Sequence, residues 1–316
     1  MLSRRSFLKG ALGAGAGFAP AATLSQPAAS QAPAAQTVRP RMIVDAQVHL
    51  WQAETPDRPW VPGRVPQLLE PFTIEKLLPL MNEAGVDRAV IVPPSWPGDR
   101  NDYALEAAKR YPDRFAVMGR ISLEKPESAA LLPKWKEQPG MLGVRLTFNR
   151  GGAAWLSDGT ADWFWPAAER AGLPVMFLAP GNMPAFVAIA ERHPRLTLII
   201  DHMALSVDIA KANKVAQAIE QTVALAKFPN VSIKLSSAPT YSLESYPFRD
   251  MKAHLKRCFD AFGPQRCYWG TDITNSFAKA TYRQRIIHFT EELDFLSEED
   301  KDWIMGRAIL ARLGWA

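Results

Sequence analysis

A glutamine and a histidine stand two residues apart at the end of a strand-like run near the start of the chain. The apolar residues 42–44 open the run, and Gln47 and His49 follow them. Alternate residues of a strand share a face, so these two side chains are expected to point the same way. Two imidazoles at this spacing would suit a divalent metal, but an amide oxygen is a poor ligand for zinc. The pair therefore raises the question of whether this protein uses a metal at all.

Two more groups capable of acid–base chemistry stand at predicted strand ends. His202 ends the apolar run 196–202, and Asp272 ends the run 267–272. A carboxylate there can bind a metal, take a proton from water or cap the next helix, and a single strand-end histidine is as often a packing residue. The occurrence of both with His49 favours a functional site. The histidines expected in surface or packing roles are His193, His254 and His288.

Two basic side chains interrupt apolar strands. Arg145 lies within the run 141–148, and Lys234 lies within 231–236. A buried cation needs a partner, which is either a protein carboxylate or an anionic substrate. Both are therefore candidates for substrate binding, together with Arg150 in the following loop. Groups that could line the same pocket, although packing would also explain them, are Ser95, Trp96 and Tyr241.

Short apolar runs alternate with amphipathic helical segments from residue 42 onward. Eight such runs over about 270 residues predict a (β/α)8 TIM barrel, an α/β fold in which chemistry lies at the carboxyl ends of the strands. The loops that would wall the pocket are 52–71, 94–100, 149–162 and 237–247. The predicted strands are 42–49, 87–93, 115–123, 141–148, 173–179, 196–202, 231–236 and 267–272, and the predicted helices are 74–84, 102–111, 162–171, 183–192, 215–228 and 248–262.

The first 35 residues resemble a twin-arginine export signal. Residues 3–9 read Ser-Arg-Arg-Ser-Phe-Leu-Lys, a weakly apolar run 10–24 follows, and cleavage is expected within 28–35. A linker at 36–41 and one barrel domain at 42–316 would remain. A disordered tail or a membrane anchor is the alternative. We therefore expect a periplasmic or exported protein that uses the twin-arginine machinery and does not stay on the membrane.

The composition and net charge indicate which kinds of partner the protein binds. The chain of 316 residues has 47% hydrophobic and 22% charged residues, as a globular protein does. Removing the leader's three basic residues lowers the formal charge from +5 to +2. This balance gives no case for nucleic acid, so a small molecule is the expected partner, with self-association left open. Cys258 and Cys267 are expected as two buried thiols or as one disulfide.

In chain order, the motifs resemble those of the amidohydrolase-related TIM-barrel family, in the branch of 2-pyrone-4,6-dicarboxylate lactonase and the sugar lactonases. The resemblance covers residues 43–313. The matching stretches are 45–51 (Asp-Ala-Gln-Val-His-Leu-Trp), 101–103, 143–145, 201–203, 230–236, 262–266, 269–272 and 306–308.

The resemblance implies that His202 contacts the attacking water or substrate and that Asp272 binds metal or activates water. It also implies a His-x-His pair on the first strand and a histidine on the fifth. This chain departs at Gln47, and residues 176–180 contain no histidine. Two of the usual imidazole ligands are therefore missing, and the branch includes enzymes that work without metal.

These residues predict a metal-independent hydrolase of a lactone or carboxylic ester. Asp272 would act as general base, and His49, His202 and Gln47 would polarise the carbonyl. Arg145, Lys234 and Arg150 would hold an oxygen-rich or carboxylated group. One alternative is a zinc-dependent hydrolase or decarboxylase of the same family that uses His49, Asp272 and His202 as ligands. Another is a barrel that binds a small molecule without catalysis.

Overall fold

The computed structural model describes residues 41–316, except for the side chains at positions 150 and 151. The predicted export signal, its cleavage region and residues 36–40 of the predicted linker lie outside the described residues. Within them, eight parallel strands form one sheet in sequence order. The strands are β1 (Val44–Val48), β2 (Arg88–Ile91), β3 (Phe115–Gly119), β4 (Met141–Thr147), β5 (Val175–Leu178), β6 (Leu198–Ile200), β7 (Val231–Lys234) and β8 (Cys267–Tyr268).

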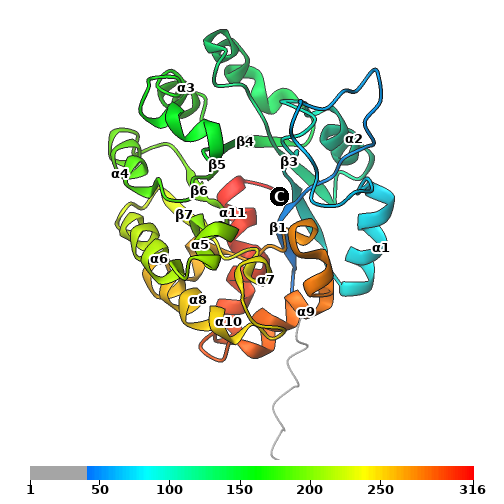
Figure 1. Ribbon diagram of the computed structural model, residues 1–316, viewed down its shortest axis with the longest axis vertical. Coiled ribbons are helices and arrows are strands. Elements are labelled where there is room, and N and C mark those ends of the chain that lie inside the picture. Colours follow the sequence, from blue (N-terminus) through cyan, green and yellow to red (C-terminus); the bar gives the residue numbers. More distant parts are fainter. Residues whose placement is uncertain (1–40) are drawn as a thin grey trace, which may run out of the picture. The chain divides into compact units, whose positions relative to one another are not determined.

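Backbone hydrogen bonds between the last strand and the first close the sheet into a barrel. Ala46 N donates to the Trp269 carbonyl over 3.1 Å, and Asp272 N donates to the Gln47 carbonyl over 3.0 Å. The helices surround the strands (Figure 1). The predicted (β/α)8 barrel is therefore confirmed. The closing bonds also bring Asp272 and Gln47, which are 225 positions apart in sequence, to the same part of the barrel mouth.

The helices occupy the segments between strands. They are α1 (Ile74–Ala84), α2 (Asp102–Arg110), α3 (Phe164–Arg170), α4 (Met183–Arg192), α5 (Val207–Lys211), α6 (Val215–Val223), α7 (Ala238–Tyr241), α8 (Arg249–Phe262), α9 (Tyr282–Ile287), α10 (Glu298–Asp302) and α11 (Ala308–Leu313). The sequence analysis did not predict α5, α7, α9, α10 or α11. It also missed the 3₁₀ helix η1 (Pro126–Glu137), where Pro126 and Pro133 break the helical pattern.

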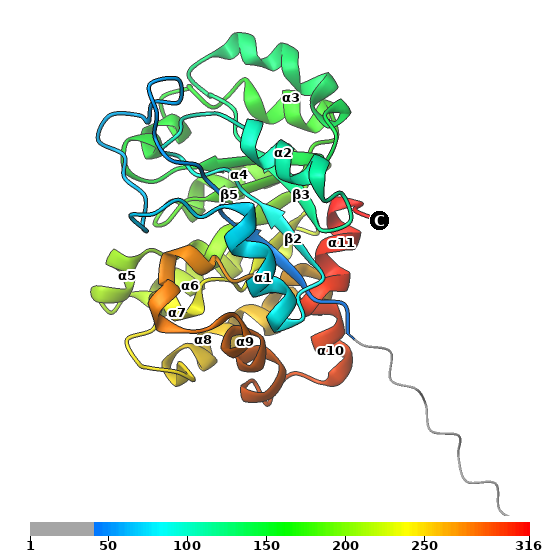
Figure 2. The same cartoon turned by 90° about the vertical axis from the view of Figure 1, so that its right-hand side faces the viewer.

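Helix α11 lies against the amino-terminal end of the barrel. Ala308, Ile309 and Leu313 pack with inward-facing strand residues such as Val44 and Met118. Figure 2 shows α11 on the opposite side of the sheet from α5 and α7. Apolar packing thus fills one end of the barrel, and the carboxyl ends of the strands remain for polar groups.

A register shift in β1 puts the Asp45 and Gln47 side chains on different faces of the strand, although simple alternation would put them on the same face. Asp45 pairs with Ala89 and Val48 with Ile91, so three steps on β1 match two on β2. The Asp45 carboxylate turns outward and accepts hydrogen bonds from Thr271 N over 2.8 Å and Tyr282 Oη over 2.5 Å. The bulge therefore leaves Gln47 and His49 to the barrel mouth.

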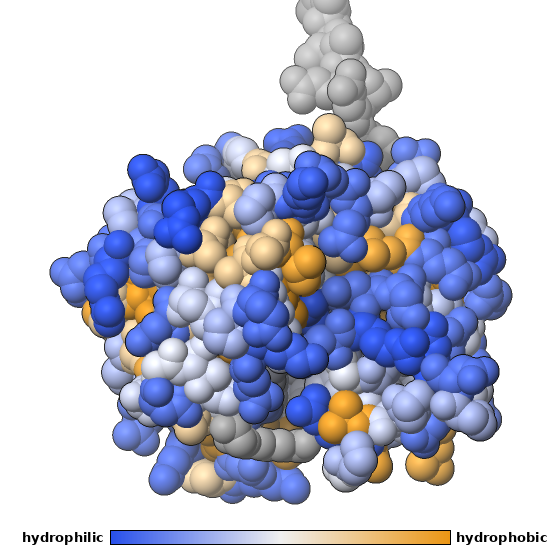
Figure 3. Space-filling model, turned by 90° about the horizontal axis from the view of Figure 1, so that it is seen from above, coloured by the Kyte–Doolittle hydropathy of each residue, from blue (hydrophilic) through white to orange (hydrophobic). Residues whose placement is uncertain are grey.

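Both cysteines, Cys258 and Cys267, are buried free thiols. Among residues 41–316, no helix is long and apolar enough to cross a membrane. The face drawn in Figure 3 is mostly hydrophilic, with separate apolar patches.

Candidate active site

A cavity of about 720 Å³ opens at the carboxyl ends of the strands. Its floor includes His49, His202 and Asp272, which follow β1, β6 and β8. The loops predicted to wall the pocket do contribute, through residues such as Gln67, Pro94, Ala153 and Thr240. The three predicted catalytic groups therefore share one site, although they are far apart in sequence.

The backbone at two of these strand ends adopts a left-handed conformation. His202, Met203 and Ala204 have φ angles of 52°, 57° and 55°, and Asp272 has a φ of 47°. Such angles are uncommon for residues other than glycine and cost on the order of 1 kcal/mol or more each. They occur where a strand must turn abruptly to direct a side chain into the cavity.

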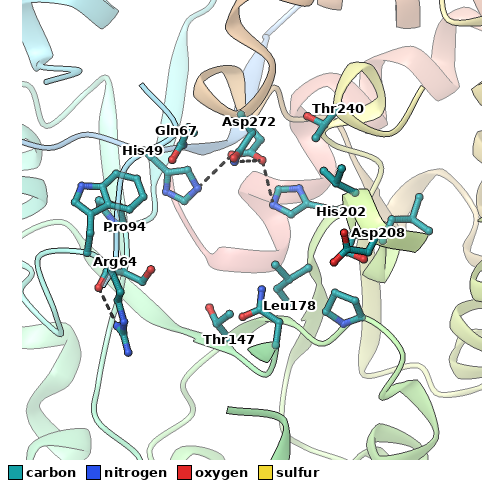
Figure 4. Close-up of a pocket in the computed structure, with 18 of the residues that line it drawn as sticks. His49, Arg64, Gln67, Pro94, Thr147, Leu178, His202, Asp208, Thr240 and Asp272 are labelled. Carbon is teal, nitrogen blue, oxygen red and sulfur yellow. Dashed lines mark hydrogen bonds and ion pairs between the residues drawn. The ribbon is translucent and has the colours of Figure 1, made fainter. Parts of the chain in front are cut away.

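The side chains of His49 and His202 both point at the Asp272 carboxylate (Figure 4). His49 Nε2 lies 3.2 Å from Asp272 Oδ1, and His202 Nε2 lies 3.5 Å from Oδ2. Ser237 Oγ and Asn275 Nδ2 donate to Oδ2 over 2.9 and 2.7 Å. Oδ2 is thus held by the protein, and Oδ1 is the freer oxygen.

These neighbours keep Asp272 ionised. Burial by itself raises the pKa of this carboxyl group, but the charge interaction with a protonated His202, the His49 hydrogen bond and the Ser237 hydroxyl outweigh it. Together they hold the pKa of Asp272 well below its usual range. At neutral pH the group is a carboxylate that can accept a proton from a bound water.

The orientation of the Gln47 amide follows from its contact with Lys234. Lys234 Nζ donates to Gln47 Oε1 over 2.7 Å, and an ammonium group has no acceptor, so the oxygen must face it. Gln47 Nε2 therefore faces the imidazoles, 3.0 Å from His202 Nε2 and 3.5 Å from His49 Nε2. His202 Nε2 accepts this bond, and its Nδ1–H donates to Ser236 Oγ over 2.7 Å.

His49 is oriented by the backbone of β2's end. Its Nδ1–H donates to the Val92 carbonyl over 2.6 Å, which leaves Nε2 toward Asp272 Oδ1. A neutral ring would set the Nε2 lone pair against a carboxylate oxygen. The contact is favourable when a proton lies between the two atoms.

A buried charge network lies beneath these groups. Asp201, fully buried, is 2.8 Å from Lys234 Nζ through Oδ1 and 3.0 Å from Arg145 Nε through Oδ2. Burial raises the pKa of Asp201, but Lys234 and Arg145 lower it to about 2. Asp201 is the protein carboxylate that the two strand cations require, and the sequence analysis assigned it no such role.

The predicted substrate-binding residues divide into two groups. Arg145, Ser95, Trp96 and Tyr241 line the cavity. Lys234 is fully buried and lies below it, so the structure does not bring this residue to the cavity wall as expected. Gln47, which was predicted to polarise the carbonyl, is also fully buried and does not line the cavity. The Arg150 side chain is outside what the structure describes.

The remaining histidines lie elsewhere. His193 Nδ1 is 3.2 Å from Glu169, and His288 is buried against Phe248 and Phe289. Sequence reasoning also missed two cations: Arg64 in the first loop, which lines the cavity, and Arg120 directly after β3, which is not among the lining residues. The signal that singled out Arg145, a charge at the end of an apolar strand, would have found Arg120 as well.

The donor set does not fit a catalytic zinc ion. His49 Nε2 and Asp272 Oδ1 are two ligands of the right type, but three protein ligands are usual. The third position holds the Gln47 NH₂ group, a donor, and His202 Nε2 already accepts from it. Within residues 41–316, no group of three His, Cys, Asp or Glu side chains is placed to bind a metal.

Comparisons with known proteins agree with this barrel. A family profile described as Amidohydrolase matches residues 44–311. The chain belongs to the amidohydrolase family. The fold and the family together make it a hydrolase.

Two relatives are named for activity on lactones. The chain is 29% identical over 234 residues to an L-fucono-1,5-lactonase of Burkholderia ambifaria, covering 72% of this chain and 79% of the relative. It is also 29% identical over 208 residues to a 4-sulfomuconolactone hydrolase of Hydrogenophaga intermedia, covering 64% and 65%.

Solved structures share the fold. An amidohydrolase of Burkholderia multivorans with bound zinc superposes with a TM-score of 0.73 at 21% identity, covering 86% of this chain and 99% of that one. A probable 2-pyrone-4,6-dicarboxylic acid hydrolase of Acinetobacter baumannii with bound citric acid gives 0.67 at 19% identity, with the same coverages. At this identity they establish the architecture alone.

A substitution at Gln47 tests why the site does not fit a zinc ion. Replacing Gln47 by Glu exchanges the NH₂ donor for a carboxylate oxygen, which would join His49 and Asp272 as a third ligand. We expect purified Gln47→Glu protein to bind Zn²⁺ at least about tenfold more tightly than wild type, measured by titration calorimetry and elemental analysis. Gln67→Glu, at the cavity rim, is the control. Stoichiometric zinc that remains bound to the wild-type protein after dialysis against a chelator would contradict the conclusion that this donor set does not fit zinc.

Stability should depend on pH through His202. Burial, the largest influence, lowers the pKa of His202 to about 4, below the ordinary value of 6.5. At pH values below 6.5, the His202 ring therefore binds a proton more readily in the unfolded state than in the folded state. The free energy of unfolding therefore has its full value above that pH. It decreases as the pH falls toward 4, by about 3 kcal/mol at most.

Urea unfolding at pH 7 and pH 5 checks this dependence. Burial gives His288 a similarly low pKa of about 4, so it contributes separately. We expect His202→Gln and His288→Gln each to reduce the difference between the two pH values. An unchanged difference in His202→Gln protein would show that the ring is not held neutral by burial.

Proposed function

We propose that this protein hydrolyses a lactone or a related carboxylic ester without a metal ion. The observation that carries the proposal is the Gln47 amide, which Lys234 turns so that a donor occupies the position of a third ligand. A carboxylate, Asp272, faces the same cavity and is free to act as a base.

In the proposed reaction, Asp272 takes up one proton and later returns it. Asp272 Oδ1 takes a proton from water as the water oxygen attacks the carbonyl carbon. Protonation of Oδ1 weakens its hold on the His49 Nε2–H, which can then donate to the developing oxyanion. When the tetrahedral intermediate collapses, the ring C–O bond breaks and the alkoxide oxygen takes the proton from Asp272. Asp272 and His49 thereby return to their starting states.

Gln47 and His202 support this step from different places. Gln47, below the cavity, acts through the imidazoles rather than by touching substrate. His202 Nε2 accepts from Gln47, so the ring stays neutral and forms one side of the floor. Arg145 holds an oxygen-rich or carboxylated substituent, and Arg150, Ser95, Trp96 and Tyr241 complete the proposed binding surface.

The absence of a Lewis acid in this scheme limits the substrate. A metal contributes several kcal/mol of charge stabilisation, and an amide also needs its nitrogen protonated before it leaves. Lactones and esters expel oxygen, and an enol lactone expels a stabilised enolate. The lactone substrates in the names of the two relatives support the same class.

A metal-dependent hydrolase or decarboxylase is the second candidate. The adjacent His49 and Asp272, 3.2 Å apart, are the observation in its favour, since both are normal metal ligands. Activity that disappears on chelation and returns with zinc would select it. Family membership argues against the third expectation, a barrel that binds without catalysis.

We expect the purified protein to hydrolyse members of a lactone panel at neutral pH in the presence of EDTA, followed with a pH indicator. Asp272→Asn should lower kcat by about 10² to 10⁴, the usual contribution of a general base. Asp208→Asn, at another carboxylate that lines the cavity, should remain within about twofold. Equal rates for Asp272→Asn and wild type would contradict the assigned base.

We also propose that the protein is exported through the twin-arginine pathway, on the strength of residues 3–9. Export in a folded state would suit a barrel whose two thiols are buried and free. Fractionation of cells should find the mature chain in the periplasm. Replacing Arg4 and Arg5 by Lys should leave the precursor in the cytoplasm, and unchanged export of that variant would argue against this route.

A further inference from the structure

We propose that the carboxyl ends of β5 and β6 carry a subsite for a hydrocarbon substituent of the substrate. The side chains that form it are Leu178, Pro180, Leu205 and Val207, all of which line the cavity that holds Asp272. These four residues are called the apolar wall below. The inference rests on the proposed function and narrows its substrate to a lactone or ester that carries an uncharged alkyl or similar hydrocarbon group.

Strand β5 ends in a hydrocarbon side chain rather than a polar one. Leu178, its last residue, pairs with Thr147 of β4, and both line the cavity. Leu178 is partly exposed, and so is Pro180, which lines the cavity two residues later. The Thr147 hydroxyl is occupied, because Arg145 Nη1 donates to it over 2.6 Å. The end of β5 therefore offers a ligand mainly apolar surface.

The segment after β6 extends this surface. Leu205 follows the left-handed turn at residues 202–204 and is fully buried. Val207, the first residue of α5, remains 42% exposed although it lines the cavity. Hydrocarbon in contact with water is stabilised when another hydrocarbon covers it. A substituent that covers Val207 would therefore be stabilised at this side of the cavity.

Polar residues between these side chains are already bonded to the protein. Asn182 Nδ2 donates to the Pro180 carbonyl over 3.0 Å, and Ser206 Oγ accepts from Ile209 N over 3.2 Å as the N-cap of α5. Residues 178–208 bring no lysine or arginine to the described cavity lining, and the only carboxylate that they bring there is Asp208. An anionic substituent would find no partner on this side, so the group that fits is uncharged.

The apolar wall lies across the barrel from the cation of the first loop. β2 and β6 are four strands apart in a closed sheet of eight, so their carboxyl ends face each other. Arg64 is held at the end of β2 by a 2.9 Å hydrogen bond from its Nη1 to a backbone carbonyl there. Figure 4 shows Arg64 on the side of His49, and Asp208, the neighbour of Val207, on the side of His202. A carbonyl bound at the catalytic groups therefore has an arginine on one side and hydrocarbon on the other.

Binding of lactams tests the subsite without turnover. A lactam is an amide ring, which the proposed site is not expected to hydrolyse. Three 2-piperidones that carry a methyl, n-butyl or 3-hydroxypropyl group at carbon 6 are titrated calorimetrically into the purified protein at pH 7. A buried methylene improves binding by up to about fourfold, so we expect the butyl compound to bind at least about tenfold more tightly than the methyl compound. The hydroxypropyl group is as long as butyl, and we expect it to lose most of this gain.

Two nearly isosteric variants locate the butyl group. Val207→Thr and Leu178→Asn each place a polar group in the apolar wall, and each should reduce the butyl-to-methyl affinity ratio by at least about threefold. Val65→Thr, at an 80% exposed valine of the first loop that also lines the cavity, should keep the wild-type ratio. Leu69→Asn, at a 98% exposed leucine outside the cavity lining, is the matched control for Leu178→Asn. Thermal unfolding checks that each variant is folded, and the exposed Val207 decides the test if Leu178→Asn is unstable.

Equal binding of the methyl and butyl compounds to wild type would overturn the subsite, as would hydroxypropyl binding as tight as butyl. An unchanged ratio in Val207→Thr protein, or the same loss in Val65→Thr protein, would also overturn it, because the butyl group would then lie elsewhere. Absence of binding by all three compounds would do so too. Lactone hydrolysis is assayed separately, so a protein that hydrolyses no lactone can still show the predicted ratio. Failure of the proposed function is therefore distinguishable from failure of the subsite.

Discussion

The buried ion cluster of Lys234, Asp201 and Arg145 is the constraint on which the rest of the site depends. An ammonium or carboxylate removed from water costs several kcal/mol, and the cost is offset only when partners satisfy the charges. Here one carboxylate forms ion pairs with both cations, at 2.8 and 3.0 Å. The remaining donor capacity of Lys234 goes to the Gln47 oxygen and so decides which end of that amide meets the histidines.

This orientation determines the protonation of the groups above it. With Gln47 donating, His202 Nε2 must accept, and Nδ1–H is directed to Ser236. Asp272 receives its hydrogen bonds from Ser237 and Asn275 on one oxygen and faces His49 with the other. The result is an asymmetric carboxylate with one oxygen held by the protein and one facing His49. Such asymmetry suits proton transfer, because the freer oxygen does not have to break several bonds before it accepts a proton.

Much of the fold was readable from the chain. Strands buried on both faces appear as short apolar runs, and each of the eight predicted runs contains an observed strand. The proline-containing 3₁₀ helix η1 did not follow a helical period and was missed. Histidines and an acid at strand ends were identified because a parallel barrel gathers all strand ends at one mouth. The role of Asp201 could not be predicted, because the sequence around it does not show that its carboxylate lies between Lys234 and Arg145.

The sequence by itself determined which chemical groups are available. It replaces an imidazole by an amide at Gln47, provides no histidine in residues 176–180, and keeps His49, His202 and Asp272. Only the tertiary structure decided how those groups face one another. The β1 bulge, the left-handed turns at His202 and Asp272, and the contact with Lys234 are all features of the folded barrel. The physical reason is that a hydrogen bond depends on direction and distance, and residues as far apart in sequence as Gln47 and Lys234 acquire these only when the strands are paired.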